Sequence, residues 1–125
     1  MAVTTKTVGV QGEIKCTTAN VLHSSGLQTA YTTATSIPAN AIVTGCFIHV
    51  KAGSSESVNV KVLVGAVEIT GNIASGSLLN AANKMVAVPI VSTAMATGGG
   101  LINFTASGSG IQSGEYDVTI CYVYG

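Results

Sequence analysis

The feature that most limits the possible folds is an alternation of apolar and polar residues with a period of two. In SVNVKVLV (57–64), four valines fall on one side of the segment, and Asn59 and Lys61 fall on the other. The C-terminal segment EYDVTICYVY (115–124) repeats the pattern, with three tyrosines, a valine and an isoleucine on one side. Successive side chains of a β-strand point to opposite faces, so both segments predict half-buried antiparallel strands.

A third segment, AIVTGCFIHV (41–50), is largely apolar on both faces. Simple alternation predicts two faces. One face carries Ile42, Cys46, Ile48 and Val50, and the other carries Val43, Phe47 and His49. This composition is typical of a strand that is covered on both sides. We expect the core to cover one face and a neighbouring subunit to cover the other.

Weaker strand candidates lie on either side of these segments, and the connections between them are rich in Gly, Ser and Asn, as turns and loops are. Eight or nine short strands indicate an all-β fold. We predict a single-domain antiparallel β-sandwich or jelly roll over residues 1–125, in which residues 1–12 can form an N-terminal arm.

Two local signals refine this prediction. Pro89 cannot donate a ladder hydrogen bond, so the segment 85–91 is expected to be an edge strand or to carry a bulge. The run Gly98, Gly99 and Gly100 is expected to form a mobile loop or, equally, the point where the chain adapts to a partner.

The chain carries unusually little charge. Charged residues make up 8% of it, compared with about 25% in average soluble domains. Five lysines balance five acidic residues, arginine is absent, and the ranges 16–50 and 85–114 contain no charged residue. Uncharged surfaces with near-zero net charge promote association, and the centres of protein interfaces are depleted in charge. We therefore expect a homo-oligomer whose neighbours cover part of its surface. The alternative is an adhesive or secreted β-domain.

Charge and hydropathy also argue against two classes of partner. Phosphate binding needs clustered Lys and Arg, whereas the five lysines are scattered along the chain. No segment approaches the ~18 apolar residues of a membrane span, and the first fifteen residues lack the pattern of a signal peptide. We predict no nucleic-acid partner, no membrane association and synthesis in the cytoplasm.

The three cysteines, Cys16, Cys46 and Cys121, all fall inside predicted strands. They cannot all pair within one chain, and their wide spacing does not match the paired ligands of a zinc site. We expect buried, reduced thiols that pack as small apolar side chains. A disulfide or a reactive thiol is the alternative.

Catalytic motifs are absent from the sequence. A hydrolase needs a base beside its nucleophile. The two histidines, His23 and His49, have no acid at a recognisable spacing. Glu115 and Asp117 share a strand face, which suits a metal or glycosidase pair, but charges at the start of a final strand more often block edge pairing. We predict no enzyme activity, no catalytic residues, no cofactor and no metal site, with a small hydrolase assembled from distant residues as a remaining alternative.

Two stretches, IPANAIVTGCFIHVKAGSSESVNVKVLVGAVEI and GEYDVTICYVY, resemble a pattern found in small β-sandwich structural proteins of tailed bacteriophages. The resemblance covers roughly residues 36–69 and 100–124. It implies a virion component, and among such components we favour a capsid decoration (cement) protein that binds the major capsid protein as a homotrimer on the capsid surface. A head fibre, a tail component and a glycan- or receptor-binding module are the alternatives.

The same hypothesis names six residues as interface candidates. Val3, Val8 and Val10 would become ordered on the capsid as part of the N-terminal arm. Val43, Phe47 and His49 would pack against a neighbouring subunit. The alternation of the sequence places the second group on one strand face.

Overall fold

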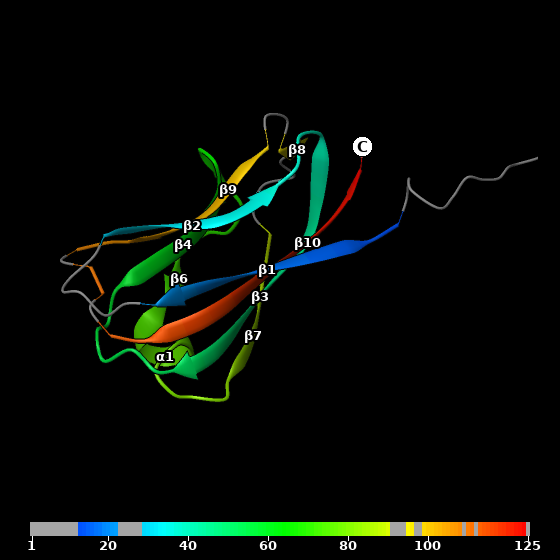
Figure 1. The fold of residues 1–125 in the computed structure, drawn as a ribbon. Helices are drawn as coiled ribbons and strands as arrows, with labels where there is room; N and C mark the ends of the chain where they lie inside the picture. Colours follow the sequence, from blue (N-terminus) through cyan, green and yellow to red (C-terminus); the bar gives the residue numbers. More distant parts are fainter. Residues whose placement is uncertain are drawn as a thin grey trace, which may run out of the picture.

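Two antiparallel sheets pack against each other with the core between them (Figure 1). The computed structural model describes residues 13–22, 29–90, 95–96, 99–108, 110–111 and 113–124. The first sheet has the order β1-β10-β3-β7, with β8 also paired to β3; its strands are β1 (Lys15–Leu22), β10 (Glu115–Tyr124), β3 (Ala41–Ala52), β7 (Met85–Val88) and β8 (Met95–Ala96). The second has the order β2-β9-β4-β5, with β6 also paired to β4; its strands are β2 (Ala30–Ile37), β9 (Gly100–Ala106), β4 (Asn59–Val64), β5 (Val67–Glu68) and β6 (Ile73–Ala74).

This architecture confirms the prediction of an all-β antiparallel sandwich. Within the described residues the helix is a single turn, α1 (Ser75–Leu78). It is far too short to cross a membrane, and the described residues contain no other candidate for a membrane-spanning helix.

The alternation of the sequence correctly identifies the inward faces of two strands. Val60, Val62 and Val64 of β4 are all buried. On β10 every second side chain from residue 116 to residue 122 is buried: Tyr116, Val118, Ile120 and Tyr122.

An aromatic contact joins the two sheets at the centre of the core. Phe104 of β9 and Tyr116 of β10 are both almost fully buried, and their ring centroids lie 5.4 Å apart with the rings tilted by 30°. The two strands belong to different sheets, so this contact contributes to the packing between the layers.

A bulge in β3 overturns the predicted faces in the first part of that strand. Tyr122 of β10 pairs with Val43 and Cys121 pairs with Gly45, so Thr44 is an extra residue in β3. An extra residue reverses the inward and outward order beyond it. The prediction that Val43 lies on the same face as Phe47 was therefore wrong: Val43 is buried in the core together with Ala41.

The last strand of the chain is a central strand of its sheet. β10 pairs with β1 on one side and with β3 on the other. The interpretation of Glu115 and Asp117 as charges that block edge pairing was therefore wrong. Both carboxylates stand on the outer face of the sheet instead of at its edge.

The two glycines that the structure describes in the predicted mobile loop lie at a close crossing of the backbone. Gly100 has φ +149° and begins β9, and a Cβ built on it would lie 2.8 Å from the Cα of Gly65. A Cβ on Gly99, at φ +65°, would lie 2.8 Å from the carbonyl oxygen of Ile37. The loop prediction was wrong for Gly100, which belongs to β9, whereas Gly99 directly precedes the strand. Only glycine fits this crossing. Gly98 lies outside the described residues.

Pro89 ends β7 at Val88, and β7 lies at the edge of the sheet order, as the sequence predicts. Beyond the proline the chain leaves β3. Ile90 then forms an isolated bridge with Thr70. Because β7 turns away while β3 continues, the structure leaves a groove beside β3.

Candidate functional site

The outer face of the first sheet carries the side chains that point away from the core on β1, β10, β3 and β7. Residues that pair directly across neighbouring strands have their side chains side by side, so these side chains form rows across the sheet. One row is Asn20, Asp117, His49 and Met85; the next is Thr18, Thr119, Phe47 and Ala87; the third is Cys16, Cys121 and Gly45.

The charged end of this face is built around two carboxylates. The amide of Asn20 donates to Glu115 Oε2 at 2.9 Å and to Asp117 Oδ1 at 3.0 Å. The ammonium group of Lys51 lies 3.8 Å from Glu115 and 3.7 Å from Asp117. Ion pairs this exposed contribute at most about 1 kcal/mol each to the stability of the fold. The main effect of the cluster is to make this end of the face polar.

Phe47 is the main apolar side chain of the middle row, and 39% of its surface is exposed. The absence of a side chain at Gly45 leaves room for its ring: a Cβ on Gly45 would lie 3.3 Å from a ring carbon of Phe47 and 4.0 Å from Cβ of Cys121. The ring therefore lies against the sheet close to the cysteine row. Met85, with 66% of its surface exposed, extends the apolar area along β7.

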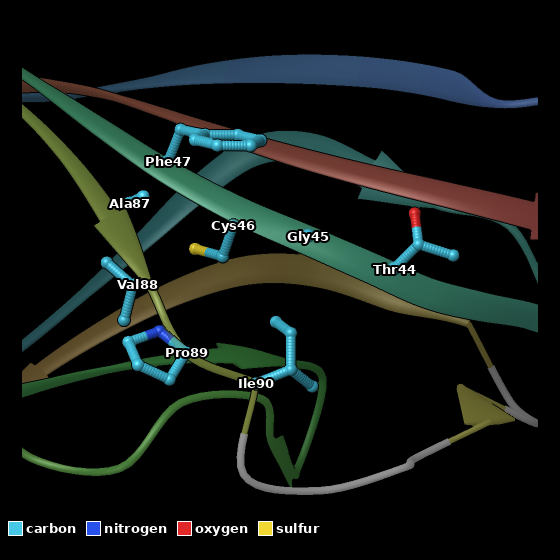
Figure 2. A pocket seen from close by; sticks show the side chains of 8 residues that line it. All are labelled: Thr44, Gly45, Cys46, Phe47, Ala87, Val88, Pro89 and Ile90. Carbon is cyan, nitrogen blue, oxygen red and sulfur yellow. The ribbon is translucent and has the colours of Figure 1, made fainter.

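A groove of about 490 Å³ adjoins Phe47 where β7 leaves β3 (Figure 2). Figure 2 shows Phe47 on one side of β3 and Cys46 on the other, with Pro89 and Ile90 below the strand. The lining of the groove is mostly apolar and consists of residues 44–47 and 87–90. Such a groove can accept an apolar side chain of a partner protein.

Cys16 and Cys121 form a disulfide in the third row, with their Cα atoms 4.1 Å apart. The expectation of reduced thiols was therefore wrong for these two residues. They lie 105 positions apart in the sequence, and only the pairing of β1 with β10 brings them face to face. Alternation within each strand gives no information about such a pair.

Cys46 behaves as the sequence predicts. It is a buried free thiol on the inward side of β3. Burial raises the pKa of this thiol to about 12, because the apolar surroundings disfavour the thiolate. It is therefore unreactive in the folded protein near neutral pH.

Of the six predicted interface residues, the structure describes three and places them on two different faces. Phe47 and His49 lie on the outer face of the first sheet, in adjacent rows. Val43 is in the core, and Val3, Val8 and Val10 lie outside the described residues. Sequence reasoning missed Met85 and Ala87, although the alternation in MVAVPIV places both on one face.

The titratable side chains that the structure describes on the outer face of the first sheet include His49, Glu115 and Asp117. In the described part of the chain, no three His, Cys, Asp or Glu side chains come together to hold a metal ion. His49 has Asp117 as its cross-strand neighbour, and His23 lies outside the described residues. The outer face of the second sheet is more polar, with a shallow hollow lined by residues that include Asn59, Lys61 and Glu68.

Solved structures of bacteriophage capsids contain chains with a similar fold. A chain in the capsid of cyanophage Pam1 superposes with a TM-score of 0.64 at 15% sequence identity, and the match covers 100% of this chain and 94% of that one. The chain shares its fold with phage capsid chains. A chain in the acid-stable capsid of Helicobacter pylori bacteriophage KHP30 gives a TM-score of 0.62 at 13% identity, covering 91% and 90% of the two chains. One in the capsid of Ralstonia phage GP4 gives 0.58 at 13% identity, covering 98% and 92%.

These matches confirm, for the fold, the resemblance to small β-sandwich proteins of phage virions. Because they cover nearly the whole of each chain, they concern the complete sandwich and not a shared pair of strands. No protein-family model and no curated protein matches the sequence.

Proposed function

We propose that this protein is a non-enzymatic structural component of a bacteriophage virion, and specifically a decoration protein that binds the outside of the capsid as a homotrimer. The observation that carries the proposal is the whole-chain likeness to chains of three phage capsids. Two features of the chain support it. The chain carries few charged residues for its size, and its first sheet presents an exposed phenylalanine beside an apolar groove.

A protein of this kind acts through binding free energy. Stable protein interfaces bury about 1,600 Å² in total, with an apolar centre and a polar rim. The outer face of the first sheet has elements of this pattern: Phe47 and Met85 are its exposed apolar side chains, the groove adjoins Phe47 at the edge where β7 leaves β3, and Asn20, Asp117 and Lys51 form a polar rim. Many copies on one shell strengthen a weak individual contact through multivalency.

The direct test is to mix the purified protein with capsids of the phage that encodes it, from which this protein has been removed. We expect the protein to sediment with the capsids and to appear in cryo-electron microscopy maps as regularly placed density on their exterior. Density at the tail, or binding to a glycan array without binding to capsids, would reject the decoration role in favour of a fibre or receptor-binding role.

The variant Phe47→Asp tests the subunit contact. A buried carboxylate at the centre of an interface is costly, so we expect the trimer to dissociate to monomers in light scattering at micromolar concentration. The variant should keep its β-sheet circular dichroism, because Phe47 is already 39% exposed.

The matched control is Leu101→Asp, which places the same charge on the outer face of the second sheet at a leucine that is 41% exposed. It should leave the native mass unchanged. If Phe47→Asp keeps the native mass of the wild type, the first sheet does not form the subunit contact.

Removal of residues 1–12 tests the proposed arm. We expect the shortened protein to lose at least tenfold in capsid affinity, because burial of the three valines of the arm would stabilise binding by about 1.5 kcal/mol or more each. A full-length variant with Val3, Val8 and Val10 all changed to Ser should lose affinity similarly. Unchanged affinity in both would show that the arm does not contact the shell.

A further inference from the structure

The Cys16–Cys121 disulfide lies where the N-terminal segment joins the sandwich. Cys16 is the second residue of β1, an edge strand whose ladder partner in the first sheet is β10. The buried apolar side chains of β1 are Ala19 and Val21, both in its second half. Lys15 and Thr17, in the first half, are only partly buried. The beginning of β1 therefore has little apolar burial to hold it, and the disulfide connects it to a central strand.

We propose that Cys16 and Cys121 form a redox-controlled crosslink, which is open while the chain is in the reducing cytoplasm and closes after release, fixing the beginning of β1 to β10. The timing rests on the proposed function, since a virion protein is made inside a cell and then works outside it. Disulfides are rare in reducing compartments and persist in oxidising ones.

The two cysteines are placed for this reaction. Cys16 is exposed and Cys121 is half-buried, and the ladder pairs their backbones directly. The folded strands therefore bring both thiols together before any bond forms. Formation of the crosslink requires no change in strand order.

Glutathione disulfide is an oxidant of suitable chemistry. The thiolate of Cys16 attacks one sulfur of glutathione disulfide, forms a mixed disulfide and releases one glutathione thiolate. The thiolate of Cys121 then attacks the Cys16 sulfur and releases the second glutathione. Overall two protein thiols lose two electrons and two protons, and one glutathione disulfide becomes two glutathione molecules.

The third cysteine does not compete in this exchange. Cys46 belongs to the same sheet, but it is only 1% exposed and lies on the inward side of β3. Its side chain and the Cys16–Cys121 pair are on opposite faces of the sheet. The folded chain therefore has a single route to an intramolecular disulfide.

Alkylation with iodoacetamide followed by intact-mass measurement tests the chemistry. The reduced native protein should take up two alkyl groups, at Cys16 and Cys121, and a third only after denaturation. In a glutathione buffer with excess oxidised form, the native protein should take up none. Persistence of two reactive thiols in that buffer, with the protein folded, would overturn the proposal.

Hydrogen exchange on the isolated protein tests the structural consequence. In a hydrogen-exchange pulse much shorter than the time for global unfolding, amides at the start of β1 (residues 15–18) should exchange at least tenfold faster on reduction because they open locally, whereas amides of β4, which open only with the whole domain, should stay protected in both redox states. The Cys16→Ser, Cys121→Ser double variant should match the reduced protein in either buffer, and Cys46→Ala should still respond to reductant. Equal exchange of β1 in both redox states would reject the role assigned to the crosslink.

The timing is tested on particles treated with N-ethylmaleimide before and after host lysis. We expect alkylated Cys16 and Cys121 in particles trapped before lysis and the disulfide in released virions. A disulfide already complete before lysis would reject the timing. The experiments on the isolated protein do not involve a capsid, so their outcome is independent of whether the decoration role is correct.

Discussion

Replacing Phe104 with Ala is expected to lower the free energy of unfolding by about 3–5 kcal/mol. Phe104 is 1% exposed and contacts Tyr116 of the opposite sheet, with ring centroids 5.4 Å apart. Truncation removes this aromatic contact and leaves a cavity in the core between the two sheets. A domain of this size has about 5–15 kcal/mol of total stability, so the loss is a large fraction of it.

The chain supplies its own control, because it contains two phenylalanines. Phe47→Ala changes the same chemical groups on the outer face of the first sheet and should cost less than about 1 kcal/mol in a monomeric sample. Both losses can be measured by urea denaturation followed by circular dichroism. Similar losses for the two variants would show that the Phe104–Tyr116 contact is not at the centre of the core.

The second large effect is expected from removal of the disulfide. Cys16 and Cys121 are separated by 105 positions, so the crosslink closes a loop that includes most of the chain. For loops of this length, the restriction of the unfolded chain corresponds to about 3–5 kcal/mol of stability. We expect the Cys16→Ser, Cys121→Ser double variant to unfold about 10–20 °C below the oxidised wild type.

Differential scanning calorimetry with and without reductant provides the measurement and its control. Reductant should lower the Tm of the wild type toward that of the double variant and leave the Tm of the double variant unchanged. If reductant lowers both equally, the effect does not come from this disulfide. If the double variant melts with the oxidised wild type, the crosslink constrains the unfolded chain far less than its loop length implies.

Together these features assign different roles to the two faces of the first sheet. Its inner face provides the contact with the second sheet, through side chains such as Tyr116 and Val118. Its outer face combines the crosslink with the exposed ring of Phe47. Gly45 lies between the crosslink and this ring: because glycine has no side chain, the ring of Phe47 occupies space beside Cys121. The crosslink and the proposed subunit contact therefore lie at neighbouring positions of the sheet.

The sequence by itself indicated the strands that the structure describes, except the two-residue strands β6 and β8, and, where alternation is regular, which side faces the core. The valines of β4 and the alternate residues of β10 follow the prediction because side-chain direction in a strand depends only on position along that strand. The same rule indicated that Phe47 and His49 share one face, and it contained the signal for Met85 and Ala87.

Only the tertiary structure decided how the strands are placed relative to one another. The bulge at Thr44 moved Val43 into the core, because an extra residue in one strand is visible only against its partner. The position of β10 between β1 and β3 put Glu115 and Asp117 on a face instead of an edge, and it joined Cys16 to Cys121. Pairings across such sequence distances are set by the packing of the whole chain, for which alternation within a single segment carries no signal.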